Sequence, residues 1–192
     1  MNERLYESLK WIAIILAMAW VAWSFYDSLY DQRKPGDNAY FAGNNLFKDG
    51  NYEQALREHE QALKENPNHI HALRGKARSL LQLKHYQAAL DTFNQAIAQA
   101  PDFAVTYANR GILYDRMGRH EKALADYEQA LQMDSQLAEG PDWLTRFFRL
   151  QPEPPPTIAD RAQYIREQLA KPPSERLLRQ PELDDKQRPY YK

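Results

Sequence analysis

The chain has 192 residues, enough for one ordinary domain with appendages, and 43% of them are hydrophobic, enough for a packed core. Its 25 basic and 26 acidic residues leave a net charge of −1, which argues against a nucleic-acid binder or a protein that binds membranes through basic patches. It contains no cysteine, so disulfides, zinc–thiolate sites and thiol catalysis are excluded.

An apolar segment follows the polar residues 1–10. Residues 11–26 carry no charge, and a helix of that length rises about 24 Å, slightly less than the roughly 30 Å hydrocarbon core of a bilayer. Lys10 can extend its ammonium group to the interface at one end. Aromatic residues gather toward both ends, as in the aromatic belts of membrane helices: Trp11, Trp20, Trp23, Tyr26 and Tyr30. We therefore expect a transmembrane anchor over residues 11–30 and a linker over 31–35.

Two other interpretations of this segment stay open. A buried helix of a soluble protein would normally show a polar face, which residues 11–26 lack. A cleaved signal peptide could use the small residues Ala22 and Ser24, although the neighbouring Trp20 and Trp23 are a poor cleavage context. Because Lys10 adjoins the span, the positive-inside rule favours a cytoplasmic N-terminus. That orientation predicts a single-pass protein of a bacterial-type inner membrane with a periplasmic domain, and a cytosolic domain is the alternative.

Three later segments, residues 51–67, 85–101 and 119–135, repeat with a period of 34 residues. Large ring-bearing residues coincide at His59, Phe93 and Tyr127. Small residues that let two helices approach closely also coincide: Gly43, Ala77 and Gly111, then Ala55, Ala89 and Ala123, then Ala62, Ala96 and Ala130. A period of this length is typical of stacked helix pairs, none of which can bury its apolar face alone.

Turn and stop signals divide each unit into two helices. Gly50 and Gly118 supply the turn between the helices, where a left-handed backbone is easiest for glycine. Pro67 and Pro101 end the second helix, because proline lacks the N–H group and clashes with the preceding turn.

These units resemble the tetratricopeptide repeat (TPR) family, whose pattern W-x2-L-G-x2-Y … A-x3-F-x2-A … P they match best at the small-residue and proline positions. Residues 107–131 are the clearest copy. The departures are His59, where an aromatic residue is usual, and Lys76 and Arg110, where leucine is commonest. The resemblance implies an all-α fold, a three-repeat solenoid over residues 36–137 with units 36–69, 70–103 and 104–137.

The sequence offers no chemistry for an enzyme. His69 and His71 lie two residues apart, but the other three histidines occupy unrelated repeat positions. There is no nucleophile elbow and no glycine-rich phosphate loop. We therefore predict neither catalytic residues nor a metal or cofactor.

The resemblance also implies a binding groove, because the first helices of TPR units line a concave surface. The residues at the groove positions are mostly basic or amide side chains, and arginine suits the carboxylates of a partner's acidic or C-terminal segment. The alternative is that these are ordinary solvated helix faces. The predicted contacts are Tyr40, Asn44, Lys48, His71, Arg74, Arg78, Asn109 and Arg116.

One known groove chemistry is a poor match. TPR co-chaperones clamp the acidic C-terminus of heat-shock chaperones with Lys and Asn in the first unit, Asn in the second, and Lys and Arg in the third. Only Asn44 fits that pattern, and the four other positions hold Tyr40, Gly75, Val105 and Asn109. The sequence thus argues against a clamp of that kind.

The residues after the repeats predict a cap and a tail. In residues 138–150, Leu144, Phe147 and Phe148 fall on one helical face, which predicts a capping helix, and Trp143 points toward the groove as a further candidate contact. Residues 151–192 hold eight of the twelve prolines and form a Pro-rich tail. Within it, Thr157 opens a predicted helix over about 157–171. That helix has an apolar stripe to lay against the groove or a partner: Ile158, Ala162, Ile165 and Leu169.

This architecture predicts a non-enzymatic, membrane-tethered scaffold or assembly factor that binds a partner protein. It is similar to that of periplasmic assembly factors with one anchor and a few TPR units, a resemblance of architecture only. The alternative is a permanent structural or accessory subunit of a larger membrane protein complex.

Overall fold

The computed structural model describes residues 3–30, 34–140, 143–148, 150, 155–180, 187 and 189–190. The chain divides into two compact units, Met1–Pro35 and Gly36–Lys192. Every regular element in the described residues is helical, as the sequence predicts.

The first unit contains one long helix, α1 (Glu3–Tyr30). It begins well before Trp11, so the polar start of the chain is helical too. The stretch Tyr6–Tyr26 has a mean hydropathy of 1.6 over an 18-residue window and is long and apolar enough to cross a membrane. Its large apolar side chains, such as Leu16 and Trp20, are exposed, which distinguishes α1 from the core helix of a soluble domain.

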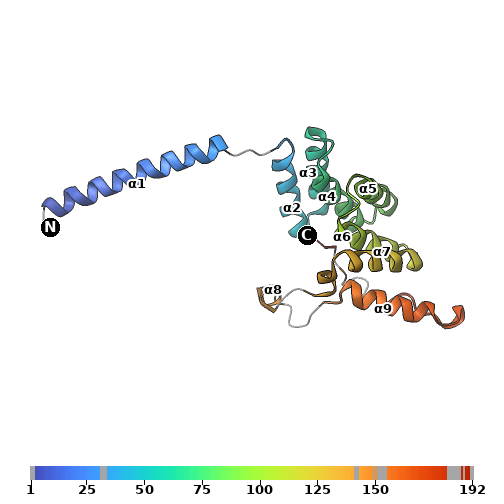
Figure 1. The fold of residues 1–192 in the computed structure, drawn as a ribbon. Helices are drawn as coiled ribbons and strands as arrows, with labels where there is room; N and C mark the ends of the chain where they lie inside the picture. Colours follow the sequence, from blue (N-terminus) through green and yellow to red (C-terminus); the bar gives the residue numbers. More distant parts are fainter. Residues whose placement is uncertain are drawn as a thin grey trace. The chain divides into compact units, whose positions relative to one another are not determined.

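The second compact unit, Gly36–Lys192, is built from helix pairs, one pair for each repeat (Figure 1). The first repeat comprises α2 (Asp37–Lys48) and α3 (Tyr52–Glu65). The second comprises α4 (Ile70–Gln82) and α5 (Tyr86–Gln99), and the third α6 (Ala104–Arg116) and α7 (His120–Met133). Within each pair the helices pack against each other, and neighbouring pairs stack through α3 on α4 and α5 on α6. The predicted solenoid is confirmed.

The turn inside each pair has the same backbone geometry. Gly50 and Gly118 have φ of 81° and 72°, and Lys84, at the matching position of the second unit, has φ of 61°. The next residue donates its N–H group back into the preceding helix in all three turns, as His85 does to Leu80 at 2.9 Å. The second repeat therefore makes this turn without glycine, and the left-handed backbone at Lys84 costs of order 1 kcal/mol.

The core alternates small residues with one ring per unit. The aligned alanines and the rings of His59, Phe93 and Tyr127 are completely buried. A methyl group on Gly75 would lie 2.4 Å from the His59 ring, and one on Gly111 would lie 2.6 Å from the Tyr127 ring. The rings thus occupy space that exists only because glycine has no side chain.

His59 is the unusual member of this core. Among the described residues, neither nitrogen of its ring has a hydrogen-bond partner. Burial, followed by the positive charge of Arg78 and the proximity of His69, lowers its pKa from 6.5 to about 3. The ring is therefore neutral at pH 7 and fills the place of an aromatic residue.

The two other residues that depart from the family pattern, Arg110 and Lys76, form ion pairs between helices. Arg110 donates to both carboxylate oxygens of Asp126 at 2.7 Å, and Lys76 lies 3.0 Å from Glu60. Each pair joins a first helix to a second helix, with the Asp126 side chain almost completely buried. These basic residues stabilise packing and do not face the groove.

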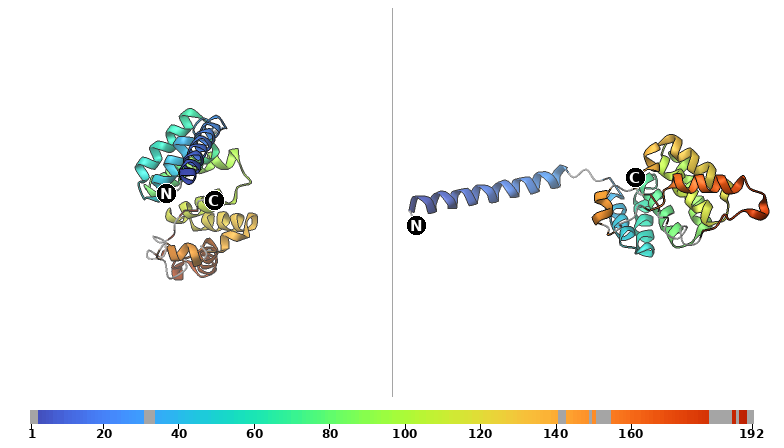
Figure 2. Two further views of the ribbon diagram at one scale, coloured as in Figure 1. Left: turned by 90° about the vertical axis from the view of Figure 1, so that its left-hand side faces the viewer. Right: turned by 90° about the horizontal axis from the view of Figure 1, so that it is seen from below.

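The helix that covers the end of the array is α9 (Ile158–Leu169), which lies along α7 (Figures 1 and 2). Its predicted capping box is present, since Thr157 accepts from the Asp160 N–H group and Asp160 accepts from that of Thr157. Ile158, Ala162 and Ile165 are buried. Their stripe therefore packs on the last repeat, not in the groove.

The described side chains of residues 138–150 do not form the expected cap. After a short 3-10 helix, η1 (Ser135–Ala138), the helix α8 (Trp143–Phe148) has only six residues. Leu144 is 47% exposed and Phe147 is 67% exposed. The side chain of Phe148 lies outside the described residues. The prediction of a cap here is wrong for Leu144 and Phe147, because α9 and the buried Leu137 of η1 already cover the apolar surface of α7.

Buried charges attach α9 to the repeats. Arg161 donates to both carboxylate oxygens of Asp115 in α6, at 2.6 and 2.9 Å. His120, the first residue of α7, lies 3.0 Å from the same carboxylate, and Arg161 also donates to the Leu178 carbonyl at 2.9 Å. The side chains of Asp115 and Arg161 are 3% and 7% exposed. The Arg161–Asp115 pair and its neighbours thus connect the last repeat, α9 and the segment that follows α9.

Candidate functional site

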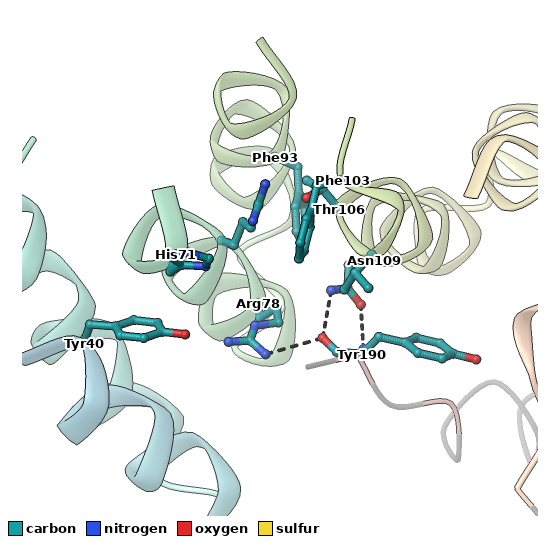
Figure 3. Close-up of a pocket in the computed structure, with 10 residues that line it drawn as sticks. Tyr40, His71, Arg78, Phe93, Phe103, Thr106, Asn109 and Tyr190 are labelled. Atoms are coloured by element: carbon teal, nitrogen blue, oxygen red, sulfur yellow. Dashed lines mark hydrogen bonds between the residues drawn. The ribbon is translucent and has the colours of Figure 1, made fainter. Parts of the chain in front are cut away.

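The first helices α2, α4 and α6 bring five of the predicted contacts to one pocket. It is partly open to solvent, and its cavity volume is about 30 Å³, enough for one or two water molecules and much too small for a folded partner. The predicted residues that line it are Tyr40, His71, Arg74, Arg78 and Asn109 (Figure 3).

Two arginines form the basic side of the pocket, and both are held by aromatic rings. The guanidinium of Arg74 lies 3.5 Å above the ring of Phe103, and that of Arg78 lies 5.3 Å from the ring of Phe47. Arg78 also donates to the Asn44 side-chain oxygen at 3.0 Å. These contacts hold both cations close to the pocket, so a ligand meets charges that are already in position.

The other side of the pocket is aromatic. The rings of Tyr40 and His71 have centroids 5.9 Å apart. His69 packs on Tyr40 as well and lies 2.9 Å from a carboxylate oxygen of Asp37. Burial and the nearby charge of Arg74 lower the pKa of His71, which keeps the His71 ring uncharged at neutral pH.

A segment of the chain's own tail occupies the groove beside this pocket. Asn109 grips the main chain of Tyr190 with both amide atoms: it accepts from the Tyr190 N–H group at 2.7 Å and donates to the Tyr190 carbonyl at 3.0 Å. Arg78 donates to the same carbonyl at 3.4 Å (Figure 3). Arg116 donates to the carbonyl of Gln187 at 2.9 Å. Three predicted groove residues therefore bind the backbone of the tail, at Gln187 and Tyr190.

The side chains of the segment are held by elements around the last repeat. The Tyr190 hydroxyl accepts from the Ile158 N–H group at 3.2 Å and donates to the Leu137 carbonyl at 3.4 Å. The side-chain amide of Gln187 donates to the buried hydroxyl of Tyr127 at 3.3 Å. Burial raises the pKa of both tyrosines, so both hydroxyls keep their protons near neutral pH.

Two predicted contacts lie elsewhere. Lys48 ends α2 as an exposed side chain and does not line the pocket. Trp143, on α8, is 70% exposed and is not part of the pocket lining. Pocket residues that the repeat pattern did not select are Phe93, Phe103, Thr106 and Tyr190. Phe103 and Tyr190 lie outside the groove positions of the repeat, and the one available signal for Tyr190 was the adjacent tyrosine pair in a polar tail.

The fold is an α-solenoid of three helix pairs, and its first helices bind the backbone of the chain's own tail. Family models described as tetratricopeptide repeat match residues 46–108 and 104–137. Residues 46–137 are therefore made of tetratricopeptide repeats.

The relatives of this chain include a stress-induced phosphoprotein and an Hsp70-Hsp90 organizing protein. Stress-induced-phosphoprotein 1 of Caenorhabditis elegans is 30% identical over 139 residues, 72% of this chain and 42% of that protein. Hsp70-Hsp90 organizing protein 3 of Arabidopsis thaliana is 28% identical over 104 residues, 54% of this chain and 19% of that protein. The chain therefore spans less than half the length of these relatives.

Solved structures show the same fold. The first TPR of Spaghetti (RPAP3), bound to the HSP90 peptide SRMEEVD, has a TM-score of 0.57 and 20% identity, covering 71% of this chain and 94% of that one. The Arabidopsis OM64 TPR domain has a TM-score of 0.51 and 22% identity, covering 53% of this chain and 84% of that one.

Proposed function

We propose that this protein is a membrane-tethered scaffold or assembly factor that binds an extended, acidic segment of a partner protein in the groove of α2, α4 and α6. The observation that carries the proposal is the grip of Asn109 and Arg78 on the main chain of Tyr190. A side-chain amide that pairs with both the N–H and the C=O of one residue recognises any extended backbone. The neighbouring arginines add a preference for negative charge.

The arrangement of these residues supports an acidic ligand in a second way. The co-chaperone clamp does not fit the first two units, where its positions hold Tyr40 and Gly75. One unit further along the array, the same positions hold Arg74 and Asn109, a basic residue and an asparagine. The peptide in the Spaghetti (RPAP3) structure, SRMEEVD, is acidic. We infer a related chemistry shifted by one repeat, with Arg78 where the clamp has its first asparagine.

The groove predicts a clear effect of charge. Arg78→Gln together with Arg116→Gln is expected to weaken the binding of the peptide SRMEEVD by about ten-fold or more, because each charge-assisted hydrogen bond contributes roughly 1.5–3 kcal/mol. Arg57→Gln, an exposed position on the second helix α3, is the matched control and should bind as the wild type does. Fluorescence anisotropy of the labelled peptide measures both. Equal affinity of all three proteins would contradict the groove assignment.

We assign the tether to α1, with the repeats on the periplasmic side of a bacterial-type inner membrane. Such a tether raises the effective concentration of the groove near membrane-bound partners. The support is the uncharged stretch of α1 with its exposed aromatic residues toward both ends, including Trp11 and Trp23.

Membrane extraction tests this assignment. The full chain is expected to stay in the membrane pellet after alkaline carbonate treatment. Leu16→Lys with Trp20→Lys should release it, because a lysine near the centre of a span costs about 2.5–3.5 kcal/mol. Glu7→Lys, in the polar start of α1, is the control that should stay in the pellet. Mature protein without residues 1–24 in mass spectrometry would show a signal peptide in place of an anchor.

The exposed apolar residues of and beside α8 favour a second candidate, a permanent subunit of a larger membrane complex. Trp143, Phe147 and Leu150 are exposed, and such a cluster is typical of a protein interface. A stoichiometric complex that survives high salt after mild detergent extraction would favour this candidate over a transient scaffold.

A further inference from the structure

The strongest unassigned feature of the molecule is the ligand that the groove already contains. The segment from Gln187 to Tyr190 contacts α4 through Arg78, α6 through Asn109 and Arg116, and α7 through Tyr127. Its described residues Gln187 and Pro189 are buried. A tail that merely lay on the surface would not place two residues out of contact with water.

The contacts divide into backbone and side-chain recognition. The backbone contacts, from Asn109, Arg78 and Arg116, are independent of sequence. The side-chain contacts select for two residues. Gln187 fits because its amide meets the Tyr127 hydroxyl, and Tyr190 fits because its hydroxyl can both accept from Ile158 and donate to Leu137. A phenylalanine at the position of Tyr190 would leave that donor and that acceptor unpaired.

The tyrosine site is made by elements outside the three helix pairs. Leu137 belongs to η1 and Ile158 is the first residue of α9, which Arg161 attaches to α6. The elements η1 and α9 therefore do more than cover α7. They supply the polar partners that distinguish tyrosine from other residues in the groove.

The charge near the segment is weakly acidic. Residues 181–190 contain Glu182, Asp184 and Asp185 against Lys186 and Arg188, a net charge of −1. The groove around the segment carries Arg74, Arg78 and Arg116. The net charge of residues 181–190 thus has the same sign as that of the acidic ligand proposed above, while Gln187 and Tyr190 supply the specific side-chain contacts.

We propose that the groove recognises an extended Gln-x-x-Tyr segment, that residues 187–190 are its built-in ligand, and that a partner binds by presenting the same pattern and displacing them. This rests on the proposed function and specifies its ligand. Because the segment is part of the same chain, it competes at an effective concentration of order 1 mM. A free peptide of similar intrinsic affinity binds only when the tail leaves.

The test uses the full chain in detergent and a fluorescein-labelled peptide with the sequence of residues 181–190, PELDDKQRPY. The variant Gln187→Ala with Tyr190→Ala is expected to bind this peptide at least ten-fold more tightly than the wild type, because its own tail no longer competes. Leu177→Ala, an exposed position of the same tail, is the control and should bind as weakly as the wild type. A peptide with alanine in place of its glutamine and its final tyrosine should not bind the tail variant.

Equal affinity of the wild type and the tail variant for the peptide, or equal binding of the two peptides, overturns the proposal. A parallel titration with SRMEEVD separates it from the proposed function. If the tail variant binds SRMEEVD but not the chain's own sequence, the acidic-ligand function stands and the Gln-x-x-Tyr inference fails. If it binds only the chain's own sequence, the inference stands and the assignment of a general acidic ligand fails.

Discussion

Replacing Arg161 by leucine is expected to lower the free energy of unfolding by about 3–5 kcal/mol. The substitution leaves the buried Asp115 carboxylate beside His120 but without its bidentate partner, and removing one partner of a buried ion pair is among the most destabilising changes in a protein interior. It also removes the hydrogen bond from Arg161 to the Leu178 carbonyl, at the start of the tail. Urea unfolding followed by circular dichroism at 222 nm measures the loss.

A second arginine on the same helix provides the matched control. Arg166 pairs with Glu128 at 2.8 Å, but both side chains are about half exposed. Arg166→Leu should therefore change the free energy of unfolding by less than about 1 kcal/mol. The double variant Asp115→Leu with Arg161→Leu should recover most of the stability lost in Arg161→Leu, because no buried charge is left alone. A loss below 1 kcal/mol in Arg161→Leu would show that α9 is held by its apolar stripe alone.

Acidification is expected to destabilise the protein through His59, by about 3 kcal/mol between pH 7 and pH 4. In the folded protein burial, then Arg78 and His69, lower the pKa of this histidine from 6.5 to about 3. Between these two values the unfolded chain binds a proton that the folded chain does not. The contribution of the neutral His59 to the free energy of unfolding is therefore fully present above pH 6.5 and is lost as the pH falls toward 3.

The variant His59→Phe isolates this effect, because phenylalanine does not titrate and Phe93 already occupies the matching position of the second unit. Between pH 7 and pH 4, the free energy of unfolding of this variant should fall by about 3 kcal/mol less than that of the wild type. His85→Gln removes an exposed histidine and should keep the wild-type pH dependence. Parallel pH profiles of the wild type and His59→Phe would show that His59 is protonated in the folded protein too.

The repeat architecture could be predicted because its signals are local and periodic. The alanines that recur every 34 residues, such as Ala55, Ala89 and Ala123, are completely buried in the structure. The turns at Gly50 and Gly118 have the left-handed backbone that glycine favours. The capping box at Thr157 depends on residues three positions apart. In each case, the residues that decide the structure are neighbours in sequence or occupy equivalent positions in the period.

The groove residues could be selected by the same register, since five of the predicted contacts line one pocket. Arg116 and Asn44 lie beside it, through their contacts with Gln187 and Arg78. The prediction missed on Trp143, because the position of residues 138–150 is not set by the repeat. Without a following repeat, nothing in a six-residue helix specifies what its apolar side chains pack against.

The sequence by itself thus determined the helix pairs, their turns, the buried rings and the face on which the tail lies. Only the tertiary structure decided which helix covers the last repeat and what lies in the groove. The Arg161–Asp115 pair joins residues 46 positions apart, and the Asn109–Tyr190 contact joins residues 81 positions apart. Neither separation is a multiple of the 34-residue period, and both contacts form between polar groups that are buried when the chain folds. Hydrophobic pattern and helix propensity do not predict which polar groups pair in this way, because the pairing depends on how the helices pack in three dimensions.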